Sequence, residues 1–430
     1  MKNDNFNFHR LDEETMEGNI VESVLDDDFY KFSMGQFIWD HPELKETEVE
    51  WHFNNRTKSI QLGNIISEKD FFDQIEGIKN FGIDSSGFRF LRGLEIYGDK
   101  MFSDDYLNFL KGIKFPEISF GRTDEGQLDI KWKDTWNTSM HAEMPVLRIV
   151  SGLYVRAQLK NKSKLEREAF YAEGIKRLAL KVARLREHKN VVFSDFANRR
   201  TPSPILHEYM VVRAAEELGK QFKGTSKTSL AMKHGLDPIG TWAHELAMII
   251  TALRFDGSRQ SIEQAQIELH TKWLNQFGEG IALSLPDTYG TQFTLDTLPD
   301  EIVSKLKGFR IDSEDPFVSI PRFQERFVRA GIDYKNKLFV PSDELNLDKM
   351  IAISDAFGAS SMISHGWGGG FGNDFGFNKV SIICKPYSAN GKFCVKLSDN
   401  VEKAIGEYGT VKKYKEALNY KGEYAKVCIS

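Results

Sequence analysis

The chain has 430 residues, of which 41% are hydrophobic and 28% are charged, and its formal net charge at pH 7 is −5. These values indicate a folded protein with enough length for one large domain and a smaller second one, and they exclude disorder as its main state. The acidic balance gives no basic field for nucleic acid, and no apolar run approaches the roughly 18 residues of a membrane span, so we predict neither partner and expect a cytoplasmic location.

The first part of the chain mixes helical and strand patterns. Residues 49–53 alternate between apolar and polar side chains, which predicts a strand. Residues 119–121 and 128–132 flank a turn-forming segment that contains glycine, which predicts a hairpin. We therefore predict an N-terminal α+β domain over residues 1–144.

A different rhythm begins at about residue 145. A helical period of apolar residues predicts a long amphipathic helix over residues 165–187. After it, short apolar runs that each end in a polar or glycine-containing segment alternate with helical patterns. The runs lie at residues 191–193, 222, 239, 280–285, 309, 338–340 and 361–364. The alternation is typical of a parallel sheet covered by helices on both faces. An open doubly wound sheet would show a similar rhythm, but seven or eight strand ends favour an irregular (β/α) barrel, which we place at residues 145–389.

The last part of the chain has another hairpin pattern. Residues 380–384 and 392–397 flank a turn sequence that contains Asn390-Gly391. The tail that follows is rich in charge. We expect this tail, about residues 390–430, to pack back on the N-terminal domain, so that both ends of the chain build one α+β domain beside the barrel.

A glycine-rich stretch, residues 366–372, follows the last apolar run. Backbone N–H groups that are not covered by side chains can cradle a phosphate. The stretch has neither the lysine of a nucleotide-binding P-loop nor the spacing of a dinucleotide fingerprint. A flexible surface loop is the alternative interpretation.

Charged side chains also close several of the apolar runs. Arg310 can hold a carboxylate or a phosphate in a bidentate pair. Asp287, Asp312 and Asp343 each follow an apolar run, and carboxylates at separate strand ends can hold Mg²⁺ against a pyrophosphate. Each of these aspartates taken alone is more often a helix cap, and the charged run after Arg310 taken alone is more often a surface ion-pair cluster.

Two further segments carry candidate chemistry. Phe196 and Arg199 follow a strand end, where an aromatic face can stack on a flat ring. His244 lies beside Glu245, and a histidine can accept a phosphoryl group, although most single histidines are structural hydrogen-bonding residues. Adjacent residues need not face each other, so this pairing does not establish a site.

Eight segments in this order resemble the nicotinate phosphoribosyltransferase family, to which the nicotinamide phosphoribosyltransferases are more distantly similar. The resemblance runs from about Leu25 to Asp399, nearly the whole chain. The matching segments are Asp28-Phe29-Tyr30-Lys31, Asp195-Phe196-Ala197-Asn198-Arg199, Gly224-Thr225-Ser226, Gly240-Thr241-Trp242-Ala243-His244-Glu245, Asp287-Thr288-Tyr289-Gly290, Arg310-Ile311-Asp312-Ser313-Glu314-Asp315-Pro316, Ser342-Asp343 and Lys396-Leu397-Ser398-Asp399.

The resemblance implies an enzyme of NAD biosynthesis that makes nicotinate mononucleotide and pyrophosphate from nicotinate and phosphoribosyl pyrophosphate. The substrate-binding residues that it implies are Tyr30, Phe196, Arg199, Thr225, Ser226, Asp343, Gly366, Gly368, Gly369 and Gly370. Phe196 and Tyr30 would sandwich the pyridine ring, with Tyr30 supplied by the partner subunit of a homodimer with shared active sites. Ser226 can donate a hydrogen bond to the nicotinate carboxylate, whereas nicotinamide-using relatives carry Asp there.

The resemblance also implies coupling to ATP hydrolysis. His244 would become a phosphohistidine, and Glu245, Asp312 and Arg310 would complete the catalytic set. Asp287 and Asp312 would hold Mg²⁺. Pyrophosphate would leave as the glycosidic carbon becomes cationic, and the ring nitrogen would then attack that carbon, so that catalysis rests on positioning and charge stabilisation.

The chain departs from the family pattern at a few positions. Ala197 replaces a glycine, and Ile311 and Glu314 stand where nicotinate enzymes usually carry His and Gly. The run of glycines at residues 368–370 is more similar to the nicotinamide enzymes. Three alternatives follow: a nicotinamide phosphoribosyltransferase, a quinolinate phosphoribosyltransferase, which needs more basic residues for a second carboxylate, and a catalytically silent nucleotide-binding relative.

Overall fold

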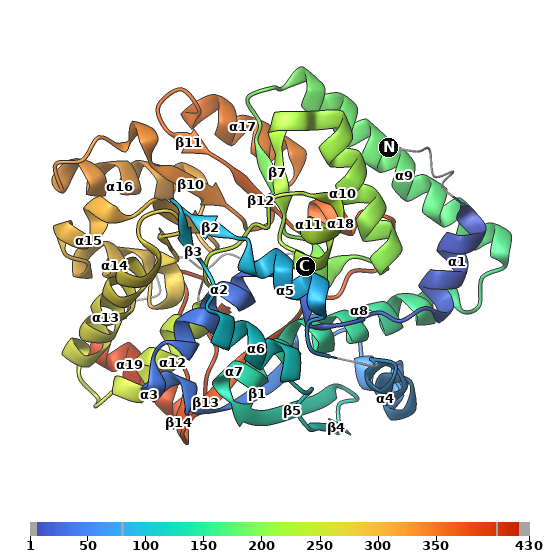
Figure 1. The fold of residues 1–430 in the computed structure, drawn as a ribbon, viewed down its shortest axis with the longest axis horizontal. Coiled ribbons are helices and arrows are strands. Elements are labelled where there is room, and N and C mark those ends of the chain that lie inside the picture. The colour runs from blue at the N-terminus through green and yellow to red at the C-terminus, as the bar shows by residue number, and fades with distance from the viewer. Residues whose placement is uncertain (1–6, 79–80, 401–402, 421–430) are drawn as a thin grey trace.

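One antiparallel sheet combines strands from both ends of the chain. The computed structural model describes residues 7–78, 81–400 and 403–420 (Figure 1). The sheet has the order β14-β13-β1-β5-β4. Its strands are β1 (Glu48–Asn55), β4 (Ile118–Arg122), β5 (Leu128–Thr135), β13 (Ile382–Ala389) and β14 (Lys392–Phe393). The predicted strand at residues 49–53 and both predicted hairpins are therefore confirmed.

Alternation places two tryptophans of this sheet on its buried face. Trp51 of β1 lies opposite Trp132 of β5 in the register, and both are buried. Their rings are parallel, with centroids 5.8 Å apart. Cross-strand aromatic pairs of this kind stabilise a sheet and fix its register.

Seven short parallel strands form the second part of the fold. They are β6 (Phe193–Asp195), β7 (Phe222–Thr225), β8 (Leu283–Ser284), β9 (Gly308–Ile311), β10 (Leu338–Pro341), β11 (Met362–Ile363) and β12 (His365–Trp367). They form two sheets, β11-β10-β9-β8 and β12-β6-β7. Ser364 joins the two sheets, because its N–H donates to Phe339 O at 3.1 Å and the next N–H, of His365, donates to Val192 O at 2.8 Å. The alternation of strands and helices is as predicted, but among the described residues the strands do not close into a hydrogen-bonded barrel.

Helices cover the parallel strands and connect the two parts of the fold (Figure 1). In chain order they are α1 (Phe8–Glu17), α2 (Phe29–Trp39), α3 (Pro42–Lys45), α4 (Glu68–Glu76), α5 (Ser85–Arg92), α6 (Asp104–Gly112), α7 (Trp136–Ser139), α8 (Glu143–Leu159), α9 (Lys164–Glu187), α10 (Pro204–Leu218), α11 (Thr228–His234), α12 (His244–Arg254), α13 (Arg259–Phe277), α14 (Thr291–Thr297), α15 (Asp300–Lys305), α16 (Pro316–Arg329), α17 (Leu347–Phe357), α18 (Gly369–Gly372) and α19 (Tyr408–Leu418). A small hairpin, β2 (Glu95–Ile96) and β3 (Asp99–Lys100), lies between α5 and α6. The predicted long helix is α9, which begins at a capping box formed by Ser163 and Glu166.

The C-terminal helix corrects one prediction. Tyr414 and Leu418 of α19 are buried in a cluster with Ile262 of α13 and Tyr289. Figure 1 shows α19 beside α12 and α13. Residues 408–418 therefore pack against the helices around the parallel strands and not against the N-terminal sheet as expected, whereas β14 of the predicted tail does join that sheet. Residues 421–430 of the predicted tail lie outside the described part.

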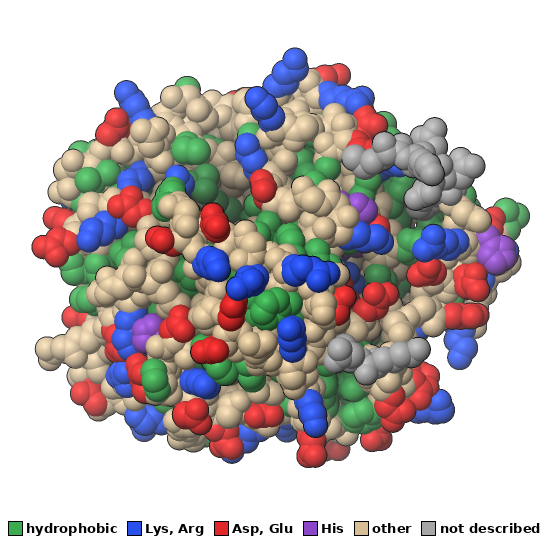
Figure 2. Space-filling model, in the orientation of Figure 1, with side chains coloured by type: hydrophobic (Ala, Val, Ile, Leu, Met, Phe, Trp, Pro, Cys, Tyr) green, Lys and Arg blue, Asp and Glu red, His purple; other side chains and the backbone are tan. Residues whose placement is uncertain are grey.

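A single large core joins the two parts. One cluster of buried apolar side chains extends from Trp51 of the antiparallel sheet to Phe309 of the parallel strands. The division into domains at residue 144 stays a prediction. None of the described helices combines the length and the apolar composition needed to cross a membrane. Figure 2 shows acidic and basic side chains interspersed over one face, in keeping with the small net charge.

Candidate active site

A cavity of about 1410 Å³ runs along the parallel strands, from residues that precede them, such as Lys307, to the side chains at their carboxyl ends. Its walls include Phe196 after β6, Arg310 on β9 and Ser342 after β10. Among its lining residues, lysine and arginine outnumber aspartate and glutamate, although the whole chain is acidic. A space of this size exceeds the pocket of one small ligand, and its charge favours anionic ligands.

Asp195 is a buried carboxylate that fixes the residues around it. Its Oδ2 accepts a hydrogen bond from Thr225 Oγ1 and lies 2.7 Å from His207 Nε2, and its Oδ1 accepts from the Ala197 N–H at 2.8 Å. The Asp195 carbonyl accepts from the Ser226 N–H at 2.9 Å. These bonds hold the backbone of the adjacent segments, so that Phe196 and Ser226 line the cavity.

The structure shows how two neighbours of Asp195, Thr225 and Ala197, are placed. Thr225 is fully buried and its hydroxyl faces Asp195, so it supports the site and is not among the residues that line the cavity. Ala197, which replaces a family glycine, has a φ of −93° and a ψ of −6°. This conformation is open to any L-residue, so the departure causes no backbone strain.

The aromatic residues expected around the ring come from the same chain. Tyr30, in the first turn of α2, and Phe196 both line the cavity. The Arg310 guanidinium carbon lies 5.5 Å from the centroid of the Phe196 ring. In the described chain Tyr30 thus lines the same cavity as Phe196, and the supply of Tyr30 by a partner subunit stays a prediction.

Ser226 has a partner that the sequence did not single out. Its Oγ donates to Asp28 Oδ1 at 2.7 Å, and Asn198 Nδ2 donates to the same oxygen at 3.1 Å. Asp28 also lines the cavity, and burial raises the pKa of its carboxyl. Asp28 was identified as part of a motif, but its place beside Ser226 depends on α2 meeting the strand that precedes α11.

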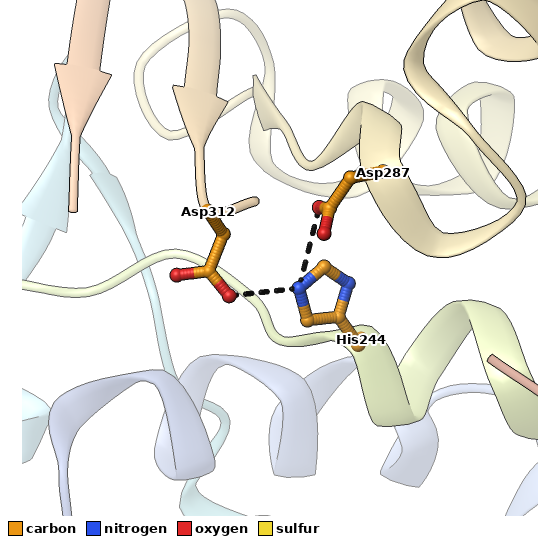
Figure 3. A group of neighbouring side chains, drawn as sticks. All are labelled: His244, Asp287 and Asp312. Atoms are coloured by element: carbon orange, nitrogen blue, oxygen red, sulfur yellow. Dashed lines mark hydrogen bonds and ion pairs between the residues drawn. The ribbon is translucent and has the colours of Figure 1, made fainter. Parts of the chain in front are cut away.

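His244 lies between two carboxylates (Figure 3). Its Nε2 is 3.2 Å from Asp312 Oδ2 and 3.4 Å from Asp287 Oδ1, and its Nδ1 is 3.1 Å from Thr288 Oγ1. Burial lowers the pKa of His244, against the pull of Asp287. Although burial opposes ionisation of Asp312, Arg310 at 2.9 Å holds the pKa of that carboxyl well below its ordinary value. The site thus combines a neutral imidazole with a firmly ionised carboxylate.

The carboxylates of this cluster fit a divalent cation. The ligand atoms of His244, Asp287 and Asp312 lie within 4.8 Å of one another, and Asp287 Oδ1 is a buried oxygen without a hydrogen-bond donor among the described residues. Carboxylate oxygens suit Mg²⁺ better than an imidazole nitrogen does. Lys396 Nζ, 2.9 Å from Asp287 Oδ2, partly neutralises the pair.

The third aspartate is joined to a lysine that the sequence did not single out. Asp343 lines the cavity, and its Oδ1 lies 2.7 Å from Lys403 Nζ, which also lies 3.2 Å from the Asp312 carbonyl oxygen. A long return of the chain brings Lys403 there, and no local pattern marks it.

Two charged residues expected at the site face elsewhere. Glu245 follows His244 in α12, but its carboxylate pairs with Lys31 and it is not among the cavity-lining residues. Successive residues on a helix point about 100° apart, which explains the divergence. Glu314 is buried against Arg322 and Ser319, so its charge is compensated away from the cavity.

The glycine stretch packs tightly against the cavity wall. A Cβ at Gly366 would lie 2.5 Å from carbon atoms of the Phe196 ring, and one at Gly370 would lie 2.5 Å from Leu345 O. A Cβ at Gly368 would lie 2.6 Å from Nη1 of Arg200. Gly366 is buried at the centre of β12, whereas Gly368, Gly369 and Gly370 line the cavity. Arg200, which was not selected from the sequence, lies against these glycines.

This fold and this cavity define an α/β enzyme whose site is built at the carboxyl ends of parallel strands. The model of the nicotinate phosphoribosyltransferase (NAPRTase) family matches residues 191–422, and the model of the NAPRTase N-terminal domain matches residues 25–151. The chain therefore belongs to the nicotinate phosphoribosyltransferase family, as the eight segments indicated.

Solved structures show the same fold. A nicotinate phosphoribosyltransferase from Vibrio cholerae is 22% identical over 96% of each chain, with a TM-score of 0.82. One from Porphyromonas gingivalis is 24% identical over 93% of this chain and 100% of that chain, with a TM-score of 0.79. At these identities the comparisons establish the common architecture.

Proposed function

We propose that the enzyme makes nicotinate mononucleotide and pyrophosphate from nicotinate and phosphoribosyl pyrophosphate, with ATP hydrolysis coupled through a phosphohistidine at His244. The observation that carries the proposal is the placement of His244, with Asp312 beside it, in the wall of the cavity that also holds Phe196, Tyr30 and Ser226. A site for a flat ring and a candidate phosphoryl acceptor thus share one space.

The pyridine ring would lie between Phe196 and Tyr30. Stacking holds the ring flat and aims its nitrogen along a fixed direction. The Ser226 hydroxyl and Arg199 would meet the carboxylate, since both line the same wall. On this account the Ser226 hydroxyl exchanges its bond to Asp28 for one to the substrate.

The phosphoribosyl group would lie between the glycine stretch and the three aspartates. Gly368, Gly369, Gly370 and Arg200 offer backbone N–H groups and a guanidinium to the 5′-phosphate. Asp343 would accept hydrogen bonds from ribose hydroxyls. Asp287 and Asp312 would hold Mg²⁺, which neutralises the pyrophosphate when bound. Arg310 lies between the ring site and Asp312, where it can stabilise charge that develops on the leaving group.

ATP would phosphorylate the neutral imidazole of His244, because only the neutral ring has a free nitrogen lone pair. The γ-phosphorus–oxygen bond of ATP breaks as the phosphorus–nitrogen bond forms, and ADP leaves. Water later cleaves the phosphorus–nitrogen bond. We also propose a homodimer, although in the described chain Tyr30 and Phe196 line the same cavity.

One observation favours nicotinamide as a second candidate substrate. The buried Asp28 carboxyl lies beside Ser226 and could accept a hydrogen bond from an amide. Asp28 Oδ1 already accepts hydrogen bonds from Ser226 and Asn198, so an amide bound at this oxygen would compete with both donors.

The proposal is tested by incubating the enzyme with phosphoribosyl pyrophosphate and Mg²⁺, and in turn with nicotinate, nicotinamide or quinolinate. Chromatography then identifies the mononucleotide, and the amount of released pyrophosphate is measured. We expect product with nicotinate, increased by ATP, and little with the other two. If only nicotinamide gave a product, nicotinamide and not nicotinate would be the substrate. Tight binding of phosphoribosyl pyrophosphate without any product would favour a catalytically silent nucleotide-binding protein.

A further inference from the structure

The first turns of α2 interlock with the segment that leads into α12. Gly240 packs so closely on Tyr30 that a Cβ there would lie 2.6 Å from the Tyr30 amide nitrogen. One turn further along α2, the Ser33 hydroxyl donates to the carbonyl oxygen of Thr241. Both sides of this contact line the cavity, because Tyr30, Gly240 and Thr241 are all lining residues. A shift of either segment therefore displaces the other.

A buried ion pair lies at the centre of this contact. Lys31 is fully buried, and its ammonium group pairs with Glu245 and, at 2.6 Å, with Glu143. Trp136 Nε1 donates to the other oxygen of Glu245 at 3.2 Å. Although burial alone disfavours its charged form, the two carboxylates raise the pKa of Lys31. Separating such charges without water leaves each of them uncompensated, so the pair resists relative movement.

The positions of the two charges in the sequence give the pair a role. Lys31 directly follows Tyr30, the residue proposed to stack on the pyridine ring. Glu245 directly follows His244, the residue proposed to accept the phosphoryl group. The ion pair therefore connects Tyr30 and His244, because each of its charged residues is the immediate neighbour in sequence of one of them. The two positions are more than two hundred residues apart in the chain.

We propose that Lys31 and Glu245 are positioning residues that couple the pyridine pocket to His244. Occupation of the ring site against Tyr30 and phosphorylation of His244 each favour the same placement of α2 on α12. This inference rests on the proposed function and deepens it, because it states how the two reactions at the site regulate each other. Coupling of this kind is reciprocal in binding.

The test uses the full-length enzyme and the double variant Lys31→Met/Glu245→Leu. Replacing both charges by apolar side chains avoids an unpaired buried charge, and Lys385 Nζ, 3.8 Å from Glu143 Oε1, still compensates Glu143. The KM for nicotinate is measured with and without ATP, together with the rate of ATP hydrolysis with and without nicotinate. We expect ATP to lower KM in the wild type by about fivefold or more, and by less than about twofold in the double variant.

Two further variants separate coupling from stability. Lys31→Arg keeps a cation at the pair, and we expect it to retain most of the ATP effect on KM. Arg167→Met removes a pair of a different kind, in which Arg167 Nε lies 2.7 Å from Asp12 Oδ1 and joins α9 to α1. Neither residue lines the cavity, so this control should keep the wild-type ratio. If the double variant does not fold, Glu245→Gln is measured in its place, with the same expected loss.

The outcomes are distinct. A folded, active double variant that keeps the wild-type ATP effect would overturn the inference and leave the pair a purely structural one. A wild-type enzyme that forms no nicotinate mononucleotide would overturn the proposed function, and a wild-type KM that does not respond to ATP would overturn the coupling, in both cases before any variant is compared.

Discussion

The hydroxyl of Ser226 donates a 2.7 Å hydrogen bond to Oδ1 of Asp28, across nearly two hundred residues of sequence. Both side chains are buried and both line the cavity. The proposed recognition of nicotinate depends on this pair, because it decides how many hydrogen-bond donors face the ring substituent.

Ser226→Asp should reverse the preference for nicotinate over nicotinamide. The new carboxylate would face Asp28 and repel a substrate carboxylate, while it could accept hydrogen bonds from an amide. We expect the ratio of the two kcat/KM values to fall by about 10- to 100-fold. Ser226→Ala is the control: it removes the donor without adding charge, so the ratio should fall less. Unchanged selectivity in Ser226→Asp would remove Ser226 as the residue that selects the substrate.

The placement of Tyr30 and Phe196 in one cavity can be tested by mixing variants. Tyr30→Ala and Phe196→Ala should each lower kcat/KM for nicotinate by about tenfold or more, because stacking on the ring is lost. In each chain Tyr30 lines the same cavity as Phe196. When the two variants are mixed and allowed to exchange subunits, the mixture should therefore show only the average of their separate activities. A marked recovery on mixing would mean that Tyr30 acts across a subunit interface.

Gly368→Ala should weaken binding of phosphoribosyl pyrophosphate. The added Cβ would lie 2.6 Å from Arg200 Nη1 and 3.3 Å from the Phe196 carbonyl oxygen, so the guanidinium must move away from the glycine stretch. We expect KM for phosphoribosyl pyrophosphate to rise by about tenfold with little change in Tm. The matched control is Gly112→Ala, because a Cβ there meets no atom within 4 Å. Equal kinetics in both variants would count against a phosphate site at this stretch.

The partly exposed carboxylate of Glu268, which pairs with Arg254 and Lys272, should make the stability of the fold depend on pH. Hydrogen bonds from Arg254 at 3.0 Å, and a pair with Lys272 at 2.8 Å, lower the pKa of Glu268 to about 2. Because this pKa lies below the roughly 4.3 of an unfolded glutamate, the stabilisation is complete above that pH and is lost as the pH falls towards 2.

Glu268→Gln should therefore lower Tm at neutral pH and matter less in acid. Solvent screens the partly exposed pair, so we expect a loss of about 1 kcal/mol, or about 1–2 °C in Tm, at pH 7. Scanning fluorimetry of both proteins at pH 7, 5 and 3.5 measures the difference. A difference in Tm that grew as the pH fell would contradict the assignment.

The fold could be predicted from the sequence where the signals are local. Apolar runs that end in polar segments identified most of the parallel strands, and alternation identified β1 and its hairpin partners. The run at Ile239 forms no named strand, and β12 (His365–Trp367) overlaps the segment that was predicted as a glycine-rich loop. Local signals do not show which strands lie next to each other or how the strands divide between the two parallel sheets. Ser364 turns the chain from one sheet to the other through two backbone hydrogen bonds, and no property of a serine marks such a junction.

The candidate site shows the same division. His244, Asp312, Phe196 and Ser226 were selected because residue type and neighbouring motifs point to chemistry, and all four line the cavity. A motif does not predict the direction in which each of its side chains points. Glu245 and Thr225 share motifs with site residues, yet their side chains face the buried partners Lys31 and Asp195. Lys403 was missed because only the folded chain brings it to the strand ends. Arg200 follows the selected Arg199 after β6, but no local pattern shows that its side chain lies against the glycine stretch.

The most direct test of the account is incorporation of phosphate from γ-labelled ATP into the wild type and a His244→Asn variant, with nicotinate mononucleotide measured in the same samples. We predict an acid-labile label on the wild type alone, and product that rises when ATP is added to the wild type. No label, or equal label on both proteins, would contradict the phosphohistidine at His244. Product formed by the wild type without label would then leave a phosphoribosyltransferase that works without this coupling.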